Sequence, residues 1–271
     1  MNVKAVTLLA TAVILAGCVE LDELLDRPKP QLQPVANLTV LRTFDDDVGY
    51  AAGTDLSGAR VIFASENITD VVAAANTGTQ LSLLNLSVDE YLLFKKTSNS
   101  TFREGEVVIE GVKYRVLVVQ DSREFANIYE LYDSLVDTGY LVARGSPLGT
   151  IPVGQFNYTG TFFEALYDTS LRGDSVTNAF GTMAATLDFE NSTFTLDGNT
   201  PNISLTADGA IDNSKGLFSS NTATIEDYGT SKSGRVVGQL HGQSAETISG
   251  IWYVDTVTGD DSGGGFVGTQ N

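Results

Sequence analysis

The sequence predicts a mainly β protein, with an eight-stranded antiparallel up-and-down β-barrel over residues 150–271 and a small α+β domain over residues 35–146 before it. The first observation behind this prediction is a change of composition near Thr150, after which charged residues become sparse and Gly, Thr, Ser and Asn become frequent. The second is that short apolar runs recur, each followed by turn residues. The third is that several runs alternate apolar and polar side chains, which is typical of half-buried strands. In one run the apolar positions are Met183, Ala185, Leu187 and Phe189.

Eight strand-like runs follow one another in this C-terminal part of the chain. They cover residues 155–167, 181–189, 192–197, 202–211, 216–225, 234–242, 248–254 and 264–270. Closure into a barrel removes the unpaired edges of such a sheet, and eight strands leave an interior that side chains can fill. An open β-sandwich is the alternative arrangement. A membrane-spanning barrel is not expected, because its strands need about 9–11 residues and an apolar outer band.

The first 18 residues have the features of a secretory signal: one basic residue, Lys4, then an apolar run too short for a membrane span, then small residues. The ending Leu-Ala-Gly-Cys resembles the lipobox of bacterial lipoproteins. This resemblance implies a signal peptide over residues 1–18, a lipidated Cys18 as the new N-terminus, and attachment to a membrane. An ordinary signal peptide with an incidental cysteine, or an uncleaved anchor, is the alternative. Val19 in place of Asp is the usual mark of export to the outer membrane in Gram-negative lipoproteins.

Residues 19–34 are polar and contain three prolines, so we expect a tether between the lipid and the folded part. The pattern of residues 35–146 is mixed. Strands are expected at residues 59–64, 89–96 and 139–145, and a hairpin is expected over residues 105–121 around Glu110-Gly111. An amphipathic helix is expected over residues 122–139, because apolar side chains recur there at steps of three and four between Ser122 and Gly139.

The composition limits the possible partners and metal sites. The formal net charge is −18, and it becomes −19 if Lys4 leaves with the signal. Such a charge argues against nucleic acid and anionic lipid headgroups as partners of the folded part, and it favours a basic protein surface, a bound cation or simple solubility. Cys18 is the only cysteine, so the mature chain has no disulfide and no thiolate metal site.

Three short stretches near the C-terminus resemble the barrel of transferrin-binding protein B and its relatives, a family of Gram-negative surface lipoproteins. They read GQLHGQSAE at residues 238–246, SGIW at residues 249–252 and GGFVG at residues 264–268. The opening of the barrel at residues 152–160 also resembles the first barrel strand of the family. The positions that match the family motif, all expected to be structural, are Gly238, Gly242, Ala245, Glu246, Gly250, Gly264, Gly265, Phe266 and Gly268.

The chain also departs from this family. Gln243 stands at the usual proline of the turn, Thr269-Gln270 replaces basic residues, and only one barrel is present instead of two lobes. Residues 35–146 match no handle domain. The resemblance therefore implies the fold, lipidation and a non-enzymatic binding role, and it does not imply transferrin as the ligand.

Candidate reactive residues are few. His241, the only histidine, lies near Glu246 and Trp252, but it has no second histidine or cysteine as a metal partner and no serine elbow beside it. We therefore expect His241 to be a structural or exposed strand residue and Trp252 to be a core or rim residue. A place at a ligand mouth is the alternative for Trp252. The carboxylate runs at residues 45–47 and 260–261 lack the spacing of a calcium loop and are expected to be solvated.

Together these features predict an outer-membrane lipoprotein that binds a protein or a small solute such as an iron carrier. We expect no catalysis, cofactor, metal or nucleic acid. The protein would lie on the cell surface or face the periplasm. A structural or assembly lipoprotein without a dedicated ligand is the alternative, and a hydrolase using carboxylates of the N-terminal domain is a third possibility.

Overall fold

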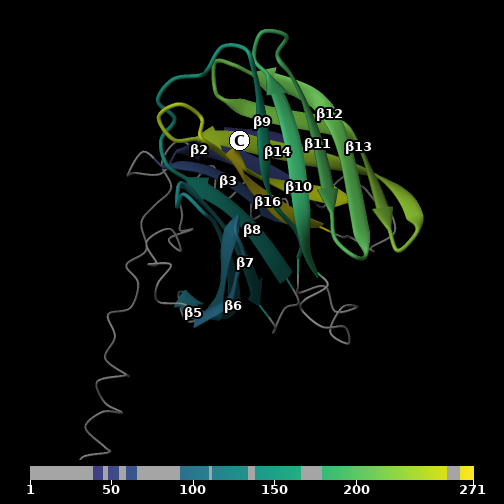
Figure 1. Cartoon of the computed structure of the whole chain (residues 1–271). Coiled ribbons are helices and arrows are strands. Elements are labelled where there is room, and N and C mark those ends of the chain that lie inside the picture. Colours follow the sequence, from purple (N-terminus) through teal and green to yellow (C-terminus); the bar gives the residue numbers. More distant parts are fainter. Residues whose placement is uncertain are drawn as a thin grey trace, which may run out of the picture. The chain divides into compact units, whose positions relative to one another are not determined.

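The computed structural model describes residues 39–44, 48–54, 59–65, 92–109, 112–133, 138–165, 179–254 and 263–271. Within these ranges the strands form two sheets, one of eight strands and one closed eight-stranded barrel (Figure 1). Both belong to one compact unit, residues 32–271. The expected signal peptide, its Cys18 and the tether over residues 19–34 lie outside the described residues, as do the carboxylate runs at residues 45–47 and 260–261. No helix in the described ranges has the length and apolar character needed to cross a membrane.

The barrel contains all eight strands that the sequence predicts. They are β9 Gln155–Glu164, β10 Phe180–Asp188, β11 Thr193–Asn199, β12 Ile203–Asp212, β13 Leu217–Asp227, β14 Thr230–His241, β15 Thr247–Val254 and β16 Gly263–Gln270. Each pairs antiparallel with the next, and β16 closes the ring by pairing with β9 from Gly264↔Glu164 to Gln270↔Tyr158. The predicted barrel is therefore confirmed, and the open sandwich is excluded.

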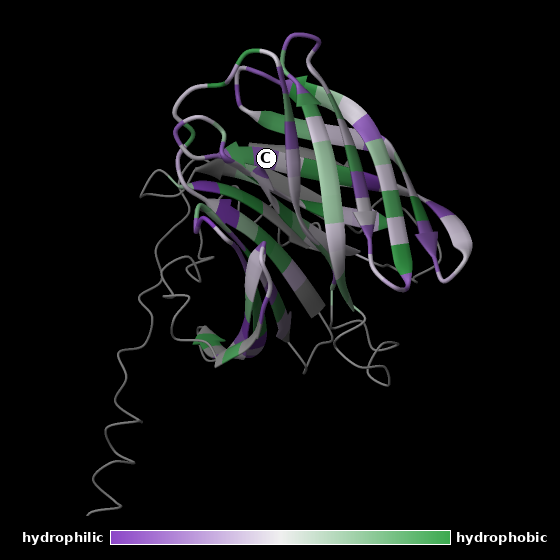
Figure 2. Cartoon of the chain, in the orientation of Figure 1, coloured by the Kyte–Doolittle hydropathy of each residue, from purple (hydrophilic) through white to green (hydrophobic). Residues whose placement is uncertain are grey.

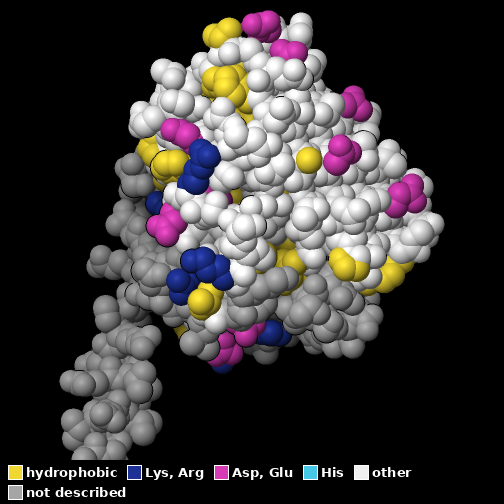
Figure 3. All heavy atoms as spheres, in the orientation of Figure 1, with side chains coloured by type: hydrophobic (Ala, Val, Ile, Leu, Met, Phe, Trp, Pro, Cys, Tyr) yellow, Lys and Arg dark blue, Asp and Glu magenta, His cyan; other side chains and the backbone are white. Residues whose placement is uncertain are grey.

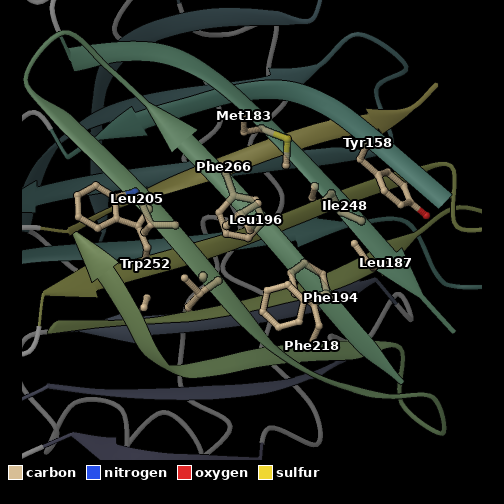
Figure 4. Packing of buried hydrophobic residues seen from close by; sticks show 14 of the residues in the cluster. Tyr158, Met183, Leu187, Phe194, Leu196, Leu205, Phe218, Ile248, Trp252 and Phe266 are labelled. Atoms are coloured by element: carbon tan, nitrogen blue, oxygen red, sulfur yellow. The ribbon is translucent and has the colours of Figure 1, made fainter. Parts of the chain in front are cut away.

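Apolar side chains fill the inside of the barrel (Figure 4). Trp252 stacks on Phe162 with ring centroids 5.2 Å apart, and both are fully buried. Glycines make room for these rings, because a Cβ on Gly198 would lie 2.3 Å from the Phe162 ring and one on Gly238 would lie 2.1 Å from the Phe218 ring. The hydropathy colours alternate along the barrel strands, in agreement with this division between interior and exterior (Figure 2).

The N-terminal sheet has the strand order β1-β2-β3-β8-β7-β6-β5-β4. Its strands are β1 Thr39–Phe44, β2 Val48–Thr54, β3 Arg60–Ser65, β4 Leu92–Lys96, β5 Ser100–Ile109, β6 Val112–Asp121, β7 Ala126–Asp133 and β8 Thr138–Gly145. The predicted strands and the β5–β6 hairpin are confirmed.

The predicted helix over residues 122–139 is wrong, because β7 and the start of β8 occupy this segment. Ile128, Tyr129, Leu131 and Tyr132 are all buried, so both faces of β7 are covered. A strand that is apolar on both faces has no period-two alternation, and its apolar residues then include a set spaced as on a helix. The α+β description of residues 35–146 is corrected accordingly: the described part of this region is all β.

The sheet covers one wall of the barrel. A single apolar cluster joins Leu117, Ile128 and Leu141 of the sheet to outward-facing barrel residues Phe163, Val237, Ile251 and Val267. The opposite wall, β10–β13, faces outward with Thr, Asp, Asn and Ser. We call this second surface the open wall.

The connection between sheet and barrel is fixed by main-chain hydrogen bonds. Gly149 N donates to Gly242 O at 3.0 Å, Thr150 N donates to Gln243 O at 2.8 Å, and Leu148 forms a parallel bridge with Gly242. The chain that leaves β8 is therefore held against the β14–β15 turn before it enters β9.

Candidate functional site

His241 lies at the end of β14 on the barrel wall that the sheet covers, and it is completely buried. Its Nε2 atom is 2.7 Å from the Ser249 hydroxyl, and its Nδ1 atom is 3.4 Å from the carbonyl oxygen of Ser146. Because a carbonyl only accepts hydrogen bonds, this geometry places the proton on Nδ1, and the Ser249 hydroxyl then donates to Nε2. The backbone of Gly145 lies against the ring, where a Cβ would come within 2.2 Å of Nδ1.

The surroundings of His241 keep the imidazole neutral. Burial lowers its pKa from 6.5 to about 3, and the positive charge of Arg60 acts in the same direction. Arg60 is nearly buried as well: it donates to the carbonyl oxygens of Leu240 at 2.9 Å and Gly216 at 3.1 Å, and also to that of Lys215. Burial lowers the pKa of the Arg60 guanidinium to about 10, so it stays charged at neutral pH.

The pair of Ser249 and His241 has the spacing of a nucleophile and its base, which the sequence did not indicate. Both side chains are completely buried between sheet and barrel, so no substrate reaches the serine. The Nδ1 atom faces a carbonyl instead of the carboxylate that would stabilise an imidazolium. The Glu246 carboxylate accepts from Ser244 N at 2.9 Å, within its own turn. The pair therefore joins β14 to β15 beneath the sheet.

The residues of the family motif lie in β14, β15, β16 and the turn between the first two. In that turn Gly242 has φ +90°, Ala245 has φ +60°, and the Tyr158 hydroxyl donates to Ala245 O at 2.8 Å. The remaining motif residues are buried or half-buried strand positions: Gly238, Gly250, Gly264, Gly265, Phe266 and Gly268. Trp252 is an interior residue, and its indole donates to Phe163 O at 3.1 Å, so it lines no ligand mouth.

The open wall contains a groove of about 500 Å³, which we call the wall groove; sequence reasoning did not find it. Two rows of paired residues lie along its floor, the first across β9–β12 and the second across β10–β12. One row is Thr159, Ala184, Asp197 and Thr206, all exposed; the other is Thr182, Asn199 and Ser204. Because these side chains are small, the space above them remains open and forms the wall groove.

The turn between β4 and β5 forms the side of the wall groove. Ser100 and Thr161 share a hydrogen bond of 2.7 Å between their hydroxyls, which fixes this turn on β9, and the neighbouring Asn99 lines the groove. A signal for this surface was present in the sequence, since the β10–β13 segments contain no lysine or arginine. In Figure 3 the surface over these strands is mostly uncharged, with scattered carboxylates.

Among the residues that the structure describes, no three His, Cys, Asp or Glu side chains come together as metal ligands.

No protein-family model matches the chain, and no curated protein matches its sequence. Among solved structures, the chain is similar to intact Ap-TbpB with its N and C lobes, at 15% identity and a TM-score of 0.45, covering 71% of this chain and 40% of that chain. It is similar to a double mutant of the vaccine antigen transferrin binding protein B from Haemophilus parasuis, at 13% identity and a TM-score of 0.45, covering 82% and 53%. A surface lipoprotein is similar at 14% identity and a TM-score of 0.41, covering 87% and 97%.

The chain spans about half the length of the two transferrin-binding proteins. The described residues between 155 and 270 form a closed antiparallel barrel of eight strands, as the resemblance to the transferrin-binding protein B family implied for residues 150–271.

Proposed function

We propose that this chain is a lipid-anchored lipoprotein of a bacterial outer membrane, exposed at the cell surface, that binds a protein or small-solute ligand and catalyses no reaction. The observation that supports this function best is the distribution of polar surface on the barrel. The lumen is filled with apolar side chains, one wall lies under the sheet, and the open wall remains as a polar surface with a groove. Binding therefore takes place on the outside of the barrel.

The absence of catalysis in this proposal rests on the burial of the Ser249–His241 pair. A hydroxyl without access to solvent or substrate attacks nothing, whatever its distance to a base.

The anchor in this proposal is Cys18. Replacing Cys18 with Ala removes the thiol that carries the lipid, and we expect the protein to leave the membrane fraction and appear in the soluble fraction. Fractionation of cells followed by immunoblotting measures this change. A matched Val19→Ala variant keeps the cysteine and should stay in the membrane fraction. Retention of Cys18→Ala in the membrane would contradict the lipobox interpretation.

Binding and orientation are tested together. Protease treatment of intact cells should cleave the protein if it faces outward, and a pull-down from the native growth medium with the purified full chain should enrich a defined ligand. Protection from the protease in intact cells but not in lysed cells would place the protein on the periplasmic side. If the folded full chain enriches no ligand, a structural lipoprotein is favoured instead.

A further inference from the structure

We propose that the wall groove receives an extended, lysine- or arginine-bearing segment of a partner protein, with Asp197 as its charge contact. This proposal deepens the proposed function and rests on it. The charge of the open wall favours a basic occupant. Asp197, Asp208 and Glu226 are exposed there, while strands β10–β13 carry no basic residue. A cationic segment complements such a surface, and an acidic one is repelled.

The polar lining of the wall groove favours an extended peptide. Its lining offers hydroxyl and amide groups from Asn99, Asn199 and several threonines beside the carboxylate of Asp197. An extended backbone needs donors and acceptors of this kind along its length, and the groove crosses four strands, which spans about 14 Å at ordinary strand spacing. These groups suit a peptide backbone with basic side chains.

An exposed aromatic residue, Tyr228, lies on the hairpin that contacts the β11–β12 turn. Tyr228 lies at the tip of the β13–β14 hairpin with 58% of its surface exposed, and its main-chain N–H donates to Asn202 O at 3.1 Å. Asn202 is two residues before Ser204, which lines the groove. An exposed aromatic ring attracts lysine and arginine side chains through its π face.

The test uses the purified full chain in neutral detergent and an oligoarginine peptide as the probe, with an oligoglutamate peptide of the same length as its counterpart. Two matched pairs of variants separate the wall groove from the general charge of the wall. Asp197→Asn and Asp208→Asn each remove one exposed carboxylate, but only Asp197 lines the groove. Ala184→Phe and Ala210→Phe each add a ring to an exposed alanine of the open wall, but only Ala184 lines the groove.

The expected result is binding of oligoarginine and not of oligoglutamate. Asp197→Asn should weaken binding about fivefold, as expected for an exposed ion pair, and Ala184→Phe should weaken it about tenfold by filling the groove. Asp208→Asn and Ala210→Phe should change it by less than about twofold. Equal losses of oligoarginine affinity in Asp197→Asn and Asp208→Asn would overturn the proposal, because they would indicate attraction by the general charge of the wall. An unchanged affinity in Ala184→Phe, at the melting temperature of the unmodified chain, would also overturn it.

The pull-down from native medium distinguishes the two levels of the proposal. If the unmodified chain enriches a protein and both Asp197→Asn and Ala184→Phe enrich it equally well, the binding function stands and the wall groove is not its site. If Ala184→Phe loses the captured protein while Ala210→Phe keeps it, the groove proposal is supported. If the unmodified chain enriches nothing, the proposed function fails, and the groove proposal fails with it.

Discussion

His241 shows how burial changes the role of a side chain. In the sequence it is a reactive residue type near a carboxylate, whereas in the fold it is a neutral ring between Ser249 and the backbone of Gly145. Arg60, on strand β3 of the sheet, carries a positive charge that makes protonation of His241 more costly. The consequence of this arrangement is a dependence of stability on pH.

We expect the free energy of unfolding to fall as the pH decreases from about 6.5 towards about 3, by up to about 1.4 kcal/mol per pH unit. The sign follows from the lowered pKa: in this window the unfolded chain binds a proton at residue 241 and the folded chain does not. Urea unfolding at a series of pH values measures the slope. His241→Gln keeps a polar side chain but does not titrate in this range, so the difference between the two proteins isolates the histidine.

Other titrating groups are present in both proteins and cancel in that difference. Asp121 is one of them: burial raises the pKa of its carboxyl, so its own contribution has the opposite sign, favouring the folded state as the pH falls. Parallel pH curves for the unmodified protein and His241→Gln would contradict the assignment of the dependence to His241.

At the scale of the secondary-structure element, the β13–β14 hairpin has an unusual turn. Asp227 pairs with Thr230, and the two residues between them have positive φ, +47° at Tyr228 and +82° at Gly229. A two-residue turn of this kind prefers Asn-Gly, because Asn tolerates the left-handed conformation far better than a bulky aromatic residue does. The pair of Asp227 and Lys232, 2.6 Å apart, strengthens the strands beside the turn.

Tyr228→Asn should therefore stabilise the protein by about 0.5–1 kcal/mol, since it removes backbone strain from the turn. Chemical denaturation with Trp252 fluorescence measures the change, because this single tryptophan lies inside the barrel. Thr230→Asn, outside the left-handed positions, is a control without this effect. A loss of stability in Tyr228→Asn would show that contacts of the tyrosine ring outweigh the strain.

At the scale of the whole molecule, the sheet and the barrel share a core. The cluster that includes Ile128 and Leu117 also includes Phe163, Ile251 and Val267 of the barrel. The Arg60 guanidinium adds hydrogen bonds from β3 to the main-chain oxygens of Gly216 and Leu240, where β13 begins and β14 ends, opposite the turn of this pair. Separation of the two parts would expose this apolar surface to water and break the hydrogen bonds of Arg60.

We expect the sheet and the barrel to unfold in one transition. Trp252 fluorescence reports on the barrel, and hydrogen exchange at β6 and β7 reports on the sheet. Their midpoints in denaturant should coincide. Arg60→Met removes the hydrogen bonds and keeps an apolar stem of similar length, and it should lower both midpoints together. A sheet that exchanges its amide hydrogens while Trp252 is still buried would contradict a single cooperative unit.

The sequence was sufficient to predict the eight barrel strands, because their interior and exterior positions alternate and glycine, asparagine or aspartate separates them. It was misleading at residues 122–139, where burial of both faces of β7 removed that alternation and the spacing of the apolar residues matched a helix. The wall groove was not predicted, because its rows of Thr, Asn and Ala come from four strands whose register only folding defines.

The sequence by itself determined the local structure of the barrel and the places where glycine lets an aromatic ring approach the opposite strand, because these depend on side-chain size and on period. The tertiary structure alone decided which wall of the barrel is covered, and therefore which outward-facing side chains are buried and which are exposed. The outward-facing His241 and Ser249 are buried because the sheet packs over β14 and β15, while the outward-facing Ala184 of β10 and Asp197 of β11 are exposed. The physical reason is that exposure of a strand's outer face depends on what packs against it from distant parts of the chain.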